Sequence, residues 1–276
     1  MKKSREPEGL LCLVGVRMYK AWMRITLRTG PLALALACCA PTPPPVVTGP
    51  APGREVYREA AQRFAAIVVS ERDDVDSWLG NHFRQKDAPK DADGGSAIPI
   101  TSDGYFLTAD HVLANADSRK VFVILRRDGR LRASRARVVW RSESEDLALI
   151  HSPVKTPGFY EWTPKDQWLA QGTAVMHAGI ATGFNSSSGH LLSPIRPETR
   201  MSGNQRFKHD IPLEPGDSGG AVVDGRGLLV GVNSAVEFLV PLETAFFIES
   251  EANRPNIARL MKRIEKDRAE RIQVSL

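Results

Sequence analysis

The chain has 276 residues, of which 42% are hydrophobic and 25% charged, and its formal net charge is +5. This composition is ordinary for a globular protein and fits one large domain or two small ones. The basic residues fall in several separate segments, partly interleaved with Asp and Glu, which argues against a nucleic-acid-binding protein.

The cysteines also restrict the class of protein. All three, Cys12, Cys38 and Cys39, lie near the N-terminus. The rest of the chain can form no disulfide, and it offers no cysteine ligands for zinc. We therefore expect a folded part without cross-links and without a metal site.

Residues 1–40 are predicted to be an export signal. A short apolar stretch at 31–40 is too brief to span a membrane, and basic residues precede it, which is the pattern of a secretory signal peptide. These basic residues are Arg17, Lys20, Arg24 and Arg28. A start at Met18 or Met23 would give the signal a more ordinary length.

The end of this segment suggests a lipid anchor. Leu34–Cys38 (LALAC) resembles a bacterial lipobox, which makes Cys38 the candidate lipidation site, although Ala35 stands where Leu is commoner. An apolar N-terminal helix with chance cysteines is the alternative. The proline-rich residues 41–53 favour an extended tether before a domain at 54–276.

The first part of that domain has helical character. Apolar residues at Val56, Ala60 and Phe64 predict a helix within 54–79, whereas Ile67–Val69 could instead form a strand. Residues 84–95 are polar and are expected to form an exposed loop.

From residue 96 onward, short apolar runs alternate with glycine-containing turns. This spacing predicts an all-β sandwich or barrel, followed by a terminal helix at 255–272. The expected strands cover 97–100, 105–108, 121–125, 137–140, 147–150, 174–178, 221–223, 228–232 and 238–240.

The segment Pro215–Gly220 (PGDSGG) carries the strongest chemical signal. A serine hydroxyl needs a nearby base and donors for an oxyanion, and glycines let the backbone turn tightly enough to supply those donors. Here the N–H groups of Gly216 and Ser218 would form the oxyanion hole. Alone, the motif could equally be a turn between strands.

Two upstream residues complete a catalytic pattern. His111 follows the predicted strand at 105–108, and Asp146 directly precedes the one at 147–150. Histidine, aspartate and serine, separated by 35 and 72 residues, occur in the order of the trypsin-like fold, whereas other hydrolase folds use other orders.

With these motifs the sequence resembles the trypsin-like serine proteases over roughly residues 95–250. The likeness is greatest to the bacterial exported branch, including the high-temperature-requirement and glutamyl endopeptidase types. The segments that carry it are Gly95–Leu113, the DLAL sequence at Asp146 and Asp210–Pro212. The resemblance implies two antiparallel six-stranded β-barrels of the trypsin-like fold, with the reactive residues between them.

The resemblance also implies a role for each matching residue. His111 would be the general base, Asp146 would orient it, and Ser218 would be the nucleophile. Ser234 would begin the strand that pairs with the substrate backbone. The specificity pocket would be lined by Pro212, Ala235, Val236 and Glu237.

Several positions depart from the family pattern. Pro212 stands where trypsin has an acid, so we expect cleavage after small or medium apolar residues rather than Lys or Arg. Asp217 replaces the Asn common in the stress proteases, and it requires a partner or solvent, which leaves latency open. Because about 56 residues follow Gly220 in this sequence, we expect no PDZ domain.

The remaining histidines show no ligand spacing and are expected to be structural or surface residues, with Asp210 a candidate partner of His209. They are His82, His151, His177, His190 and His209. The glycine- and serine-rich segment 183–189 is a candidate gating loop.

The sequence thus predicts a serine endopeptidase that hydrolyses proteins or peptides through an acyl-enzyme, without a cofactor. It would be exported to the periplasm or cell envelope, with a lipid anchor. One alternative is an inactive or latent peptide-binding module on the same fold. Another is a structural envelope lipoprotein in which the motif is incidental.

Overall fold

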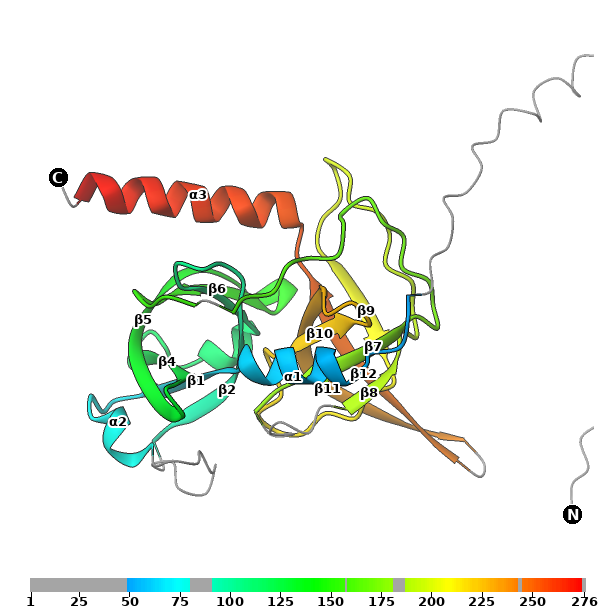
Figure 1. The fold of residues 1–276 in the computed structure, drawn as a ribbon, viewed down its shortest axis with the longest axis horizontal. Helices are drawn as coiled ribbons and strands as arrows, with labels where there is room; N and C mark the ends of the chain where they lie inside the picture. Colours follow the sequence, from blue (N-terminus) through cyan, green and yellow to red (C-terminus); the bar gives the residue numbers. More distant parts are fainter. Residues whose placement is uncertain (1–48, 80–90, 157, 181–186, 243–244, 275–276) are drawn as a thin grey trace, which may run out of the picture. The chain divides into compact units, whose positions relative to one another are not determined.

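The computed structural model describes residues 49–79, 91–156, 158–180, 187–242 and 245–274 (Figure 1). For residues 78, 187, 235–242, 245–248 and 274 it describes the backbone but not the side chains. The predicted signal, Cys38, most of the tether and His82 lie outside the described residues. So does most of the candidate gating loop. No helix in the described ranges is both long and apolar enough to cross a membrane.

The N-terminal half of the domain is a closed six-stranded barrel with the strand order β1-β2-β3-β6-β5-β4. Every neighbouring pair is antiparallel. The barrel interior holds a buried apolar cluster that includes Ile67, Phe106, Val123 and Ile150. The strands are β1 (Ala65–Ser70), β2 (Asp93–Pro99), β3 (Tyr105–Thr108), β4 (Lys120–Arg127), β5 (Arg130–Ser142) and β6 (Leu147–His151).

The C-terminal half is a second six-stranded antiparallel sheet, with the order β8-β7-β10-β11-β12-β9. The sheet curls until Leu191, just after β8, forms an isolated bridge with His209 of β9. Its strands are β7 (Ala174–Ala178), β8 (Ser187–His190), β9 (Gln205–His209), β10 (Ala221–Asp224), β11 (Leu229–Leu242) and β12 (Ala245–Arg254). The predicted all-β fold class is confirmed, with the second unit a curled half-barrel.

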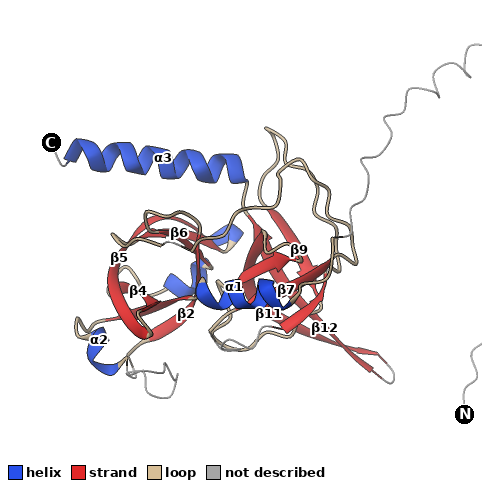
Figure 2. Cartoon of the chain, viewed as in Figure 1, coloured by secondary structure: helices blue, strands red, loops and turns tan. Residues whose placement is uncertain are grey.

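The helices are few and lie outside the two β units (Figure 2). The helix predicted within 54–79 ends at Gln62, because the strand β1 begins at Ala65. Ile67 and Val69 face the barrel interior, while Ala66 and Val68 belong to a separate buried cluster, so β1 is covered on both faces and shows no alternation. The helical elements are α1 (Arg54–Gln62), α2 (Val75–Trp78), the 3₁₀ turns η3 (Asp110–Leu113) and η4 (Glu143–Glu145), and α3 (Ile257–Val274).

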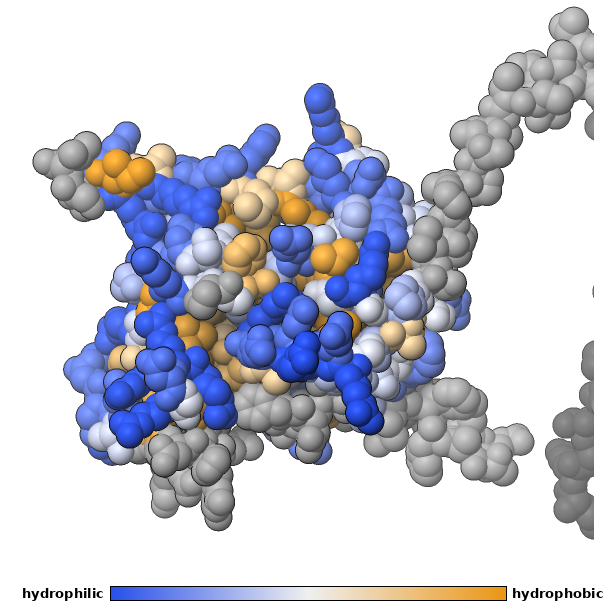
Figure 3. Space-filling view, viewed as in Figure 1, coloured by the Kyte–Doolittle hydropathy of each residue, from blue (hydrophilic) through white to orange (hydrophobic). Residues whose placement is uncertain are grey.

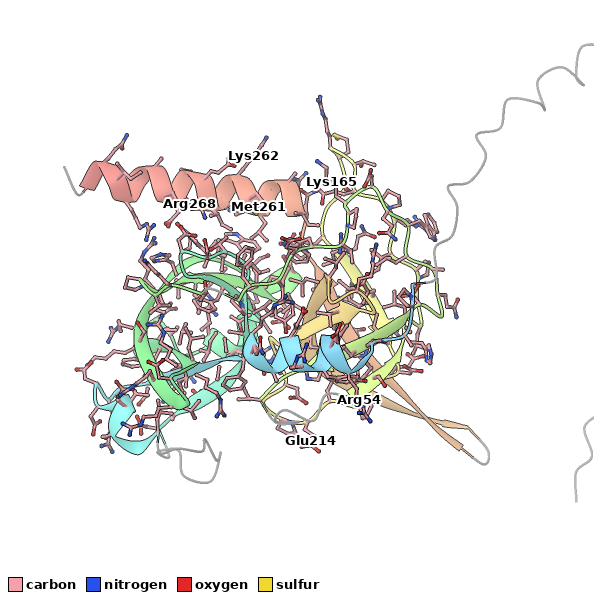
Figure 4. All side chains as sticks on the ribbon, in the orientation of Figure 1. Arg54, Lys165, Glu214, Met261, Lys262 and Arg268 are labelled. Carbon is pink, nitrogen blue, oxygen red and sulfur yellow. The ribbon has the colours of Figure 1, made fainter. Side chains whose placement is uncertain are left out.

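The terminal helix α3 packs on the first barrel, as the sequence pattern predicts for a helix with one apolar face. Figure 4 shows Met261 and Arg268 on the side of α3 toward the barrel and Lys262 pointing away. Arg268 donates two hydrogen bonds, of 2.9 and 2.7 Å, to the carboxylate of Asp103. The surface seen in Figure 3 is mostly hydrophilic, with a small apolar patch beneath α3.

The two β units share one buried cluster. Leu107 and Leu149 of the first barrel pack with Met176 and Val232 of the second unit, and Ile264 of α3 joins them. Because this apolar core continues across the boundary, it fixes the position of one β unit against the other. Residues contributed by both units can therefore meet in a fixed geometry.

Candidate active site

His111 lies on a short 3₁₀ turn that directly follows β3. Its neighbours anchor the turn: Asp110 is buried and accepts a 2.8 Å hydrogen bond from Arg141 Nε, and Val112 and Leu113 are buried in the apolar core. The His111 side chain itself remains 49% exposed. The turn therefore presents the imidazole at the surface while its flanking residues fix the backbone.

Asp146 orients this imidazole. Its backbone is left-handed, with φ of 44°, between η4 and β6. The carboxylate accepts hydrogen bonds from the His111 backbone N–H (3.0 Å) and from His111 Nδ1 (3.0 Å to each oxygen), and Ser234 Oγ donates to its Oδ2. Because Nδ1 carries the proton that Asp146 accepts, Nε2 is left as the unprotonated, basic nitrogen.

The protonation equilibria agree with this arrangement. The hydrogen bond to Asp146 raises the pKa of His111 above its ordinary value. Desolvation opposes ionisation of Asp146, but the hydrogen bonds from His111 and Ser234 outweigh it and keep the pKa of Asp146 below its ordinary value. At neutral pH the acid is thus a carboxylate that can stabilise an imidazolium.

Ser218 follows a tight turn that begins at Glu214, which Figure 4 places at the edge of the molecule opposite α3. The Asp217 N–H donates to Glu214 O (2.9 Å), with Pro215 second and Gly216 third in the turn. Gly216 has φ of 107°, a conformation that a type II turn requires and glycine adopts readily. Within the described part of the chain, the N–H groups of Gly216 and Ser218 have no protein acceptor.

Ser96 of β2 ties this turn to the first barrel. Its N–H donates to Ser218 O (2.8 Å), and its hydroxyl donates to Gly216 O (2.8 Å) and accepts from Ile180 N–H (2.9 Å). On the other side, the Gly219 N–H donates to Asn233 O (2.8 Å), next to Ser234. The serine turn is thereby held from both β units, and Ser234 links it to Asp146.

The predicted substrate-binding residues lie along the same region. Pro212 is exposed, and Ser234 is buried against Asp146. Ala235, Val236 and Glu237 belong to β11, but their side chains are not described. The β11–β12 register shifts between Asn233 and Glu237, which places a bulge at this point of the strand.

One prediction is wrong. Asp210 does not pair with His209; instead its Oδ2 lies 3.5 Å from Nδ1 of His190, and His209 hydrogen-bonds Asn233. Asp217 is completely buried rather than solvated, and its Oδ1 lies 3.3 Å from Nε2 of His177, also completely buried. The sequence did not identify His177 as this neighbour, because nothing in the local sequence connects the serine turn with β7.

Comparison with known proteins defines the class of the chain. A family model of the trypsin-like peptidase domain matches residues 95–232, half of the chain, and the protein belongs to this family. The chain is 25% identical over 255 residues to a probable periplasmic serine endoprotease, DegP-like, of Hahella chejuensis, covering 82% of this chain and 51% of that protein. It is 28% identical over 151 residues to the serine protease Do-like HtrA of Lactobacillus helveticus, covering 52% and 35% respectively.

The chain thus spans about half or less of the length of these curated relatives. Solved structures show the same fold. The HtrA-type protease AlgW with a decapeptide aligns with a TM-score of 0.50 and 24% identity over 76% of this chain and 67% of its own. Deg5 aligns with a TM-score of 0.51 and 17% identity over 75% and 90%.

Proposed function

We propose that this protein is a serine endopeptidase in which Ser218, His111 and Asp146 act together. The observation that carries the proposal is the set of hydrogen bonds at Asp146, which fixes the Nδ1–H tautomer of His111 and leaves Nε2 free to accept a proton. Membership of the trypsin-like peptidase family supports the same assignment.

The reaction proceeds in two balanced steps. His111 Nε2 takes the Ser218 hydroxyl proton as Oγ bonds to the scissile carbonyl carbon, and the proton then passes to the leaving amine as the C–N bond breaks. A water molecule repeats the sequence on the acyl-enzyme, which releases the carboxylic acid and restores Ser218. The oxyanion formed in both steps would accept hydrogen bonds from the N–H groups of Gly216 and Ser218, which have no acceptor within the described ranges.

The substrate is a protein or peptide bound in an extended form along β11 from Ser234 to Glu237. One structural neighbour, the protease AlgW, is described with a decapeptide, which supports a peptide ligand. Since Pro212 offers no charge, the residue before the scissile bond should be small or medium and apolar. A cleavage profile on proteome-derived peptides measures this, and a strong preference for Arg or Lys would contradict it.

The protein is proposed to act after export, in the periplasm or cell envelope, because several relatives are described as periplasmic. The anchor would be a lipid on Cys38, extended by the proline-rich tether. Cys38→Ser should abolish metabolic labelling with a fatty-acid analogue. Unchanged labelling would place the anchor elsewhere.

An active-site probe tests the catalytic proposal. A fluorophosphonate should label the folded wild type, Ser218→Ala should abolish labelling, and the peptidase rate of this variant should fall roughly 10⁴-fold or more. Ser202→Ala, which removes another serine, is the matched control and should label normally. An unlabelled wild type would favour an inactive peptide-binding module, and equal rates for wild type and Ser218→Ala would favour a structural role.

A further inference from the structure

Four fully buried polar side chains lie behind the serine turn, and the proposed reaction leaves them without a role. Asp217 belongs to the turn, His177 to β7, Asn233 to β11 and His209 to the end of β9. Three strands of the half-barrel contribute the two histidines and the asparagine, in a region otherwise lined by apolar residues such as Phe207. Buried polar groups of this kind are costly unless each finds a partner.

The hydrogen bonds among them run in one direction, starting at β9. The Ile211 backbone N–H donates to His209 Nδ1 (3.3 Å), so Nδ1 is the unprotonated nitrogen. His209 Nε2 must then carry the proton and donate it to Asn233 Oδ1 (2.8 Å). Burial lowers the pKa of His209 to about 4, which keeps this ring neutral at physiological pH.

The same logic fixes the next residue. Since Asn233 accepts through Oδ1, its amide Nδ2 donates to His177 Nδ1. The proton of His177 is therefore on Nε2, which faces Asp217 Oδ1 at 3.3 Å. This is an electrostatic contact and not a hydrogen bond, because the buried Nε2 of His177 makes no hydrogen bond within the described ranges.

This series of buried contacts ends at the Asp217 carboxylate, which also stabilises the serine turn. The second oxygen of Asp217, Oδ2, accepts the Glu214 N–H (3.0 Å), while the Asp217 N–H donates to Glu214 O (2.9 Å). The carboxylate therefore supports, from inside the protein, the turn in which the N–H groups of Gly216 and Ser218 have no acceptor among the described residues. A carboxylate without this support would be drawn toward solvent and would carry the turn with it.

Two glycines enclose the His177–Asp217 pair. A Cβ atom at Gly179 would lie 2.4 Å from Asp217 Oδ1 and 2.6 Å from His177 Nε2, and one at Gly220 would lie 2.6 Å from His177 Cε1. The backbone approaches the pair so closely that no side chain fits. The site is therefore closely built around a histidine and a carboxylate, and it is not a chance contact in a loose cavity.

We propose that His177 is a positioning residue for hydrolysis: held in a single tautomer by Asn233 and His209, it secures the Asp217 carboxylate and thereby the oxyanion donors Gly216 and Ser218. This inference rests on the proposed peptidase activity and extends it to residues that never touch the substrate. It also gives the buried acid beside the nucleophile a defined neighbour in the half-barrel.

His177→Phe keeps a ring of similar size and removes the Nε2 donor. On a peptide substrate, kcat should fall about 10²-fold or more, the loss expected from a displaced oxyanion donor, with a much smaller change in KM. His151→Phe is the matched control, because His151 is also buried but lies in the first barrel beside Tyr105. The folded control protein should retain the kcat of the wild type.

A double variant separates positioning from general damage. Adding Asp217→Asn to His177→Phe removes the buried charge that has lost its contact with His177, while the amide oxygen can still accept the Glu214 N–H. We expect the double variant to recover about tenfold in kcat over His177→Phe, because coupled residues are not additive. The proposal would be overturned if folded His177→Phe kept a kcat within about threefold of the wild type. It would also be overturned if the fold-loss in kcat of the double variant equalled the product of the losses in the two single variants, since the residues would then act independently.

A readout independent of catalysis uses the wild-type protein alone. Nitrogen-15 NMR should show both His177 and His209 as neutral Nε2–H tautomers at neutral pH, and Asp217→Asn should shift the His177 signal. A Nδ1–H tautomer or an imidazolium at His177 would refute the proposed series of hydrogen bonds from His209 through Asn233 to His177. If the spectra agree with that series but no peptide is cleaved, the proposed peptidase activity is wrong and the series of buried hydrogen bonds is still supported.

Discussion

Replacement of Asp146 by asparagine is expected to lower kcat about 10⁴-fold and leave the fold intact. The carboxylate accepts from the His111 backbone N–H, from His111 Nδ1 and from Ser234 Oγ. An asparagine has only one acceptor oxygen, so its NH₂ group must face a donor or the ring. When it faces the ring, the imidazole proton moves to Nε2, and the nitrogen that should accept the Ser218 proton is occupied.

The pH profile gives this prediction a second readout. Since activity requires neutral His111, kcat/KM of the wild type rises as the pH increases through the His111 pKa, which Asp146 holds above its ordinary value. Asp146→Asn removes that hydrogen bond to a charged acceptor, so the pKa falls and the acid limb moves to lower pH. Rates measured from pH 5 to 9 test both effects.

Asp103→Asn serves as the control, because it removes a carboxylate that pairs with Arg268 on α3, away from the reacting groups. Its kcat and pH profile should match the wild type. A folded Asp146→Asn protein with nearly full activity would show that Asp146 does not fix the His111 tautomer. The proposed roles of all three residues would then have to be revised.

The sequence predicts the fold class and family well because both leave local signals. Glycine at Gly216, a histidine after a short strand and an acid before the next one are contiguous patterns that identify the trypsin-like family. The all-β architecture with a terminal helix follows from equally local alternation of apolar runs and turns. These motifs can be recognised from the sequence alone, although most of the contacts that build the site join residues distant in sequence.

What the sequence could not provide is the pairing between strands. His177, Asn233 and His209 meet only because β7, β11 and β9 curl into one half-barrel, and each residue alone reads as a satisfied structural side chain. The sequence indicates that Asp217 needs a partner or solvent, but it does not indicate that His177 is the histidine beside it. The sequence also left residues 67–69 open between helix and strand, because both faces of β1 are buried and its apolar residues do not alternate with polar ones.

The close packing around the serine turn leads to the second large expected effect, at Gly219. A Cβ atom there would lie 2.3 Å from both Ser96 O and Thr108 Oγ1, and the residue has φ of 83°. Thr108 Oγ1 donates to Ser96 O at 2.9 Å, so neither oxygen can retreat without breaking that bond. Gly219→Ala should therefore lower the free energy of unfolding by about 3 kcal/mol or more, from backbone strain plus overpacking.

Gly172 supplies a closely matched control, because its φ is 82° and nothing lies within 4 Å of its added Cβ. Gly172→Ala carries the left-handed strain alone, about 1 kcal/mol. Urea unfolding of both variants then isolates the steric contribution, provided that their m-values agree. Equal destabilisation by the two substitutions would mean that β2 and β3 move enough to accommodate the methyl group at Gly219 without a steric cost.

The same pair of variants links stability to catalysis. The carbonyl that the Gly219 methyl would displace belongs to Ser96, whose N–H and hydroxyl hold Ser218 O and Gly216 O. Folded Gly219→Ala should therefore also label poorly with the fluorophosphonate, whereas Gly172→Ala should label like the wild type. A destabilised Gly219→Ala protein that labels normally would show that the serine turn tolerates movement of β2, so that its geometry depends mainly on the half-barrel side, where Asp217 and Asn233 hold it.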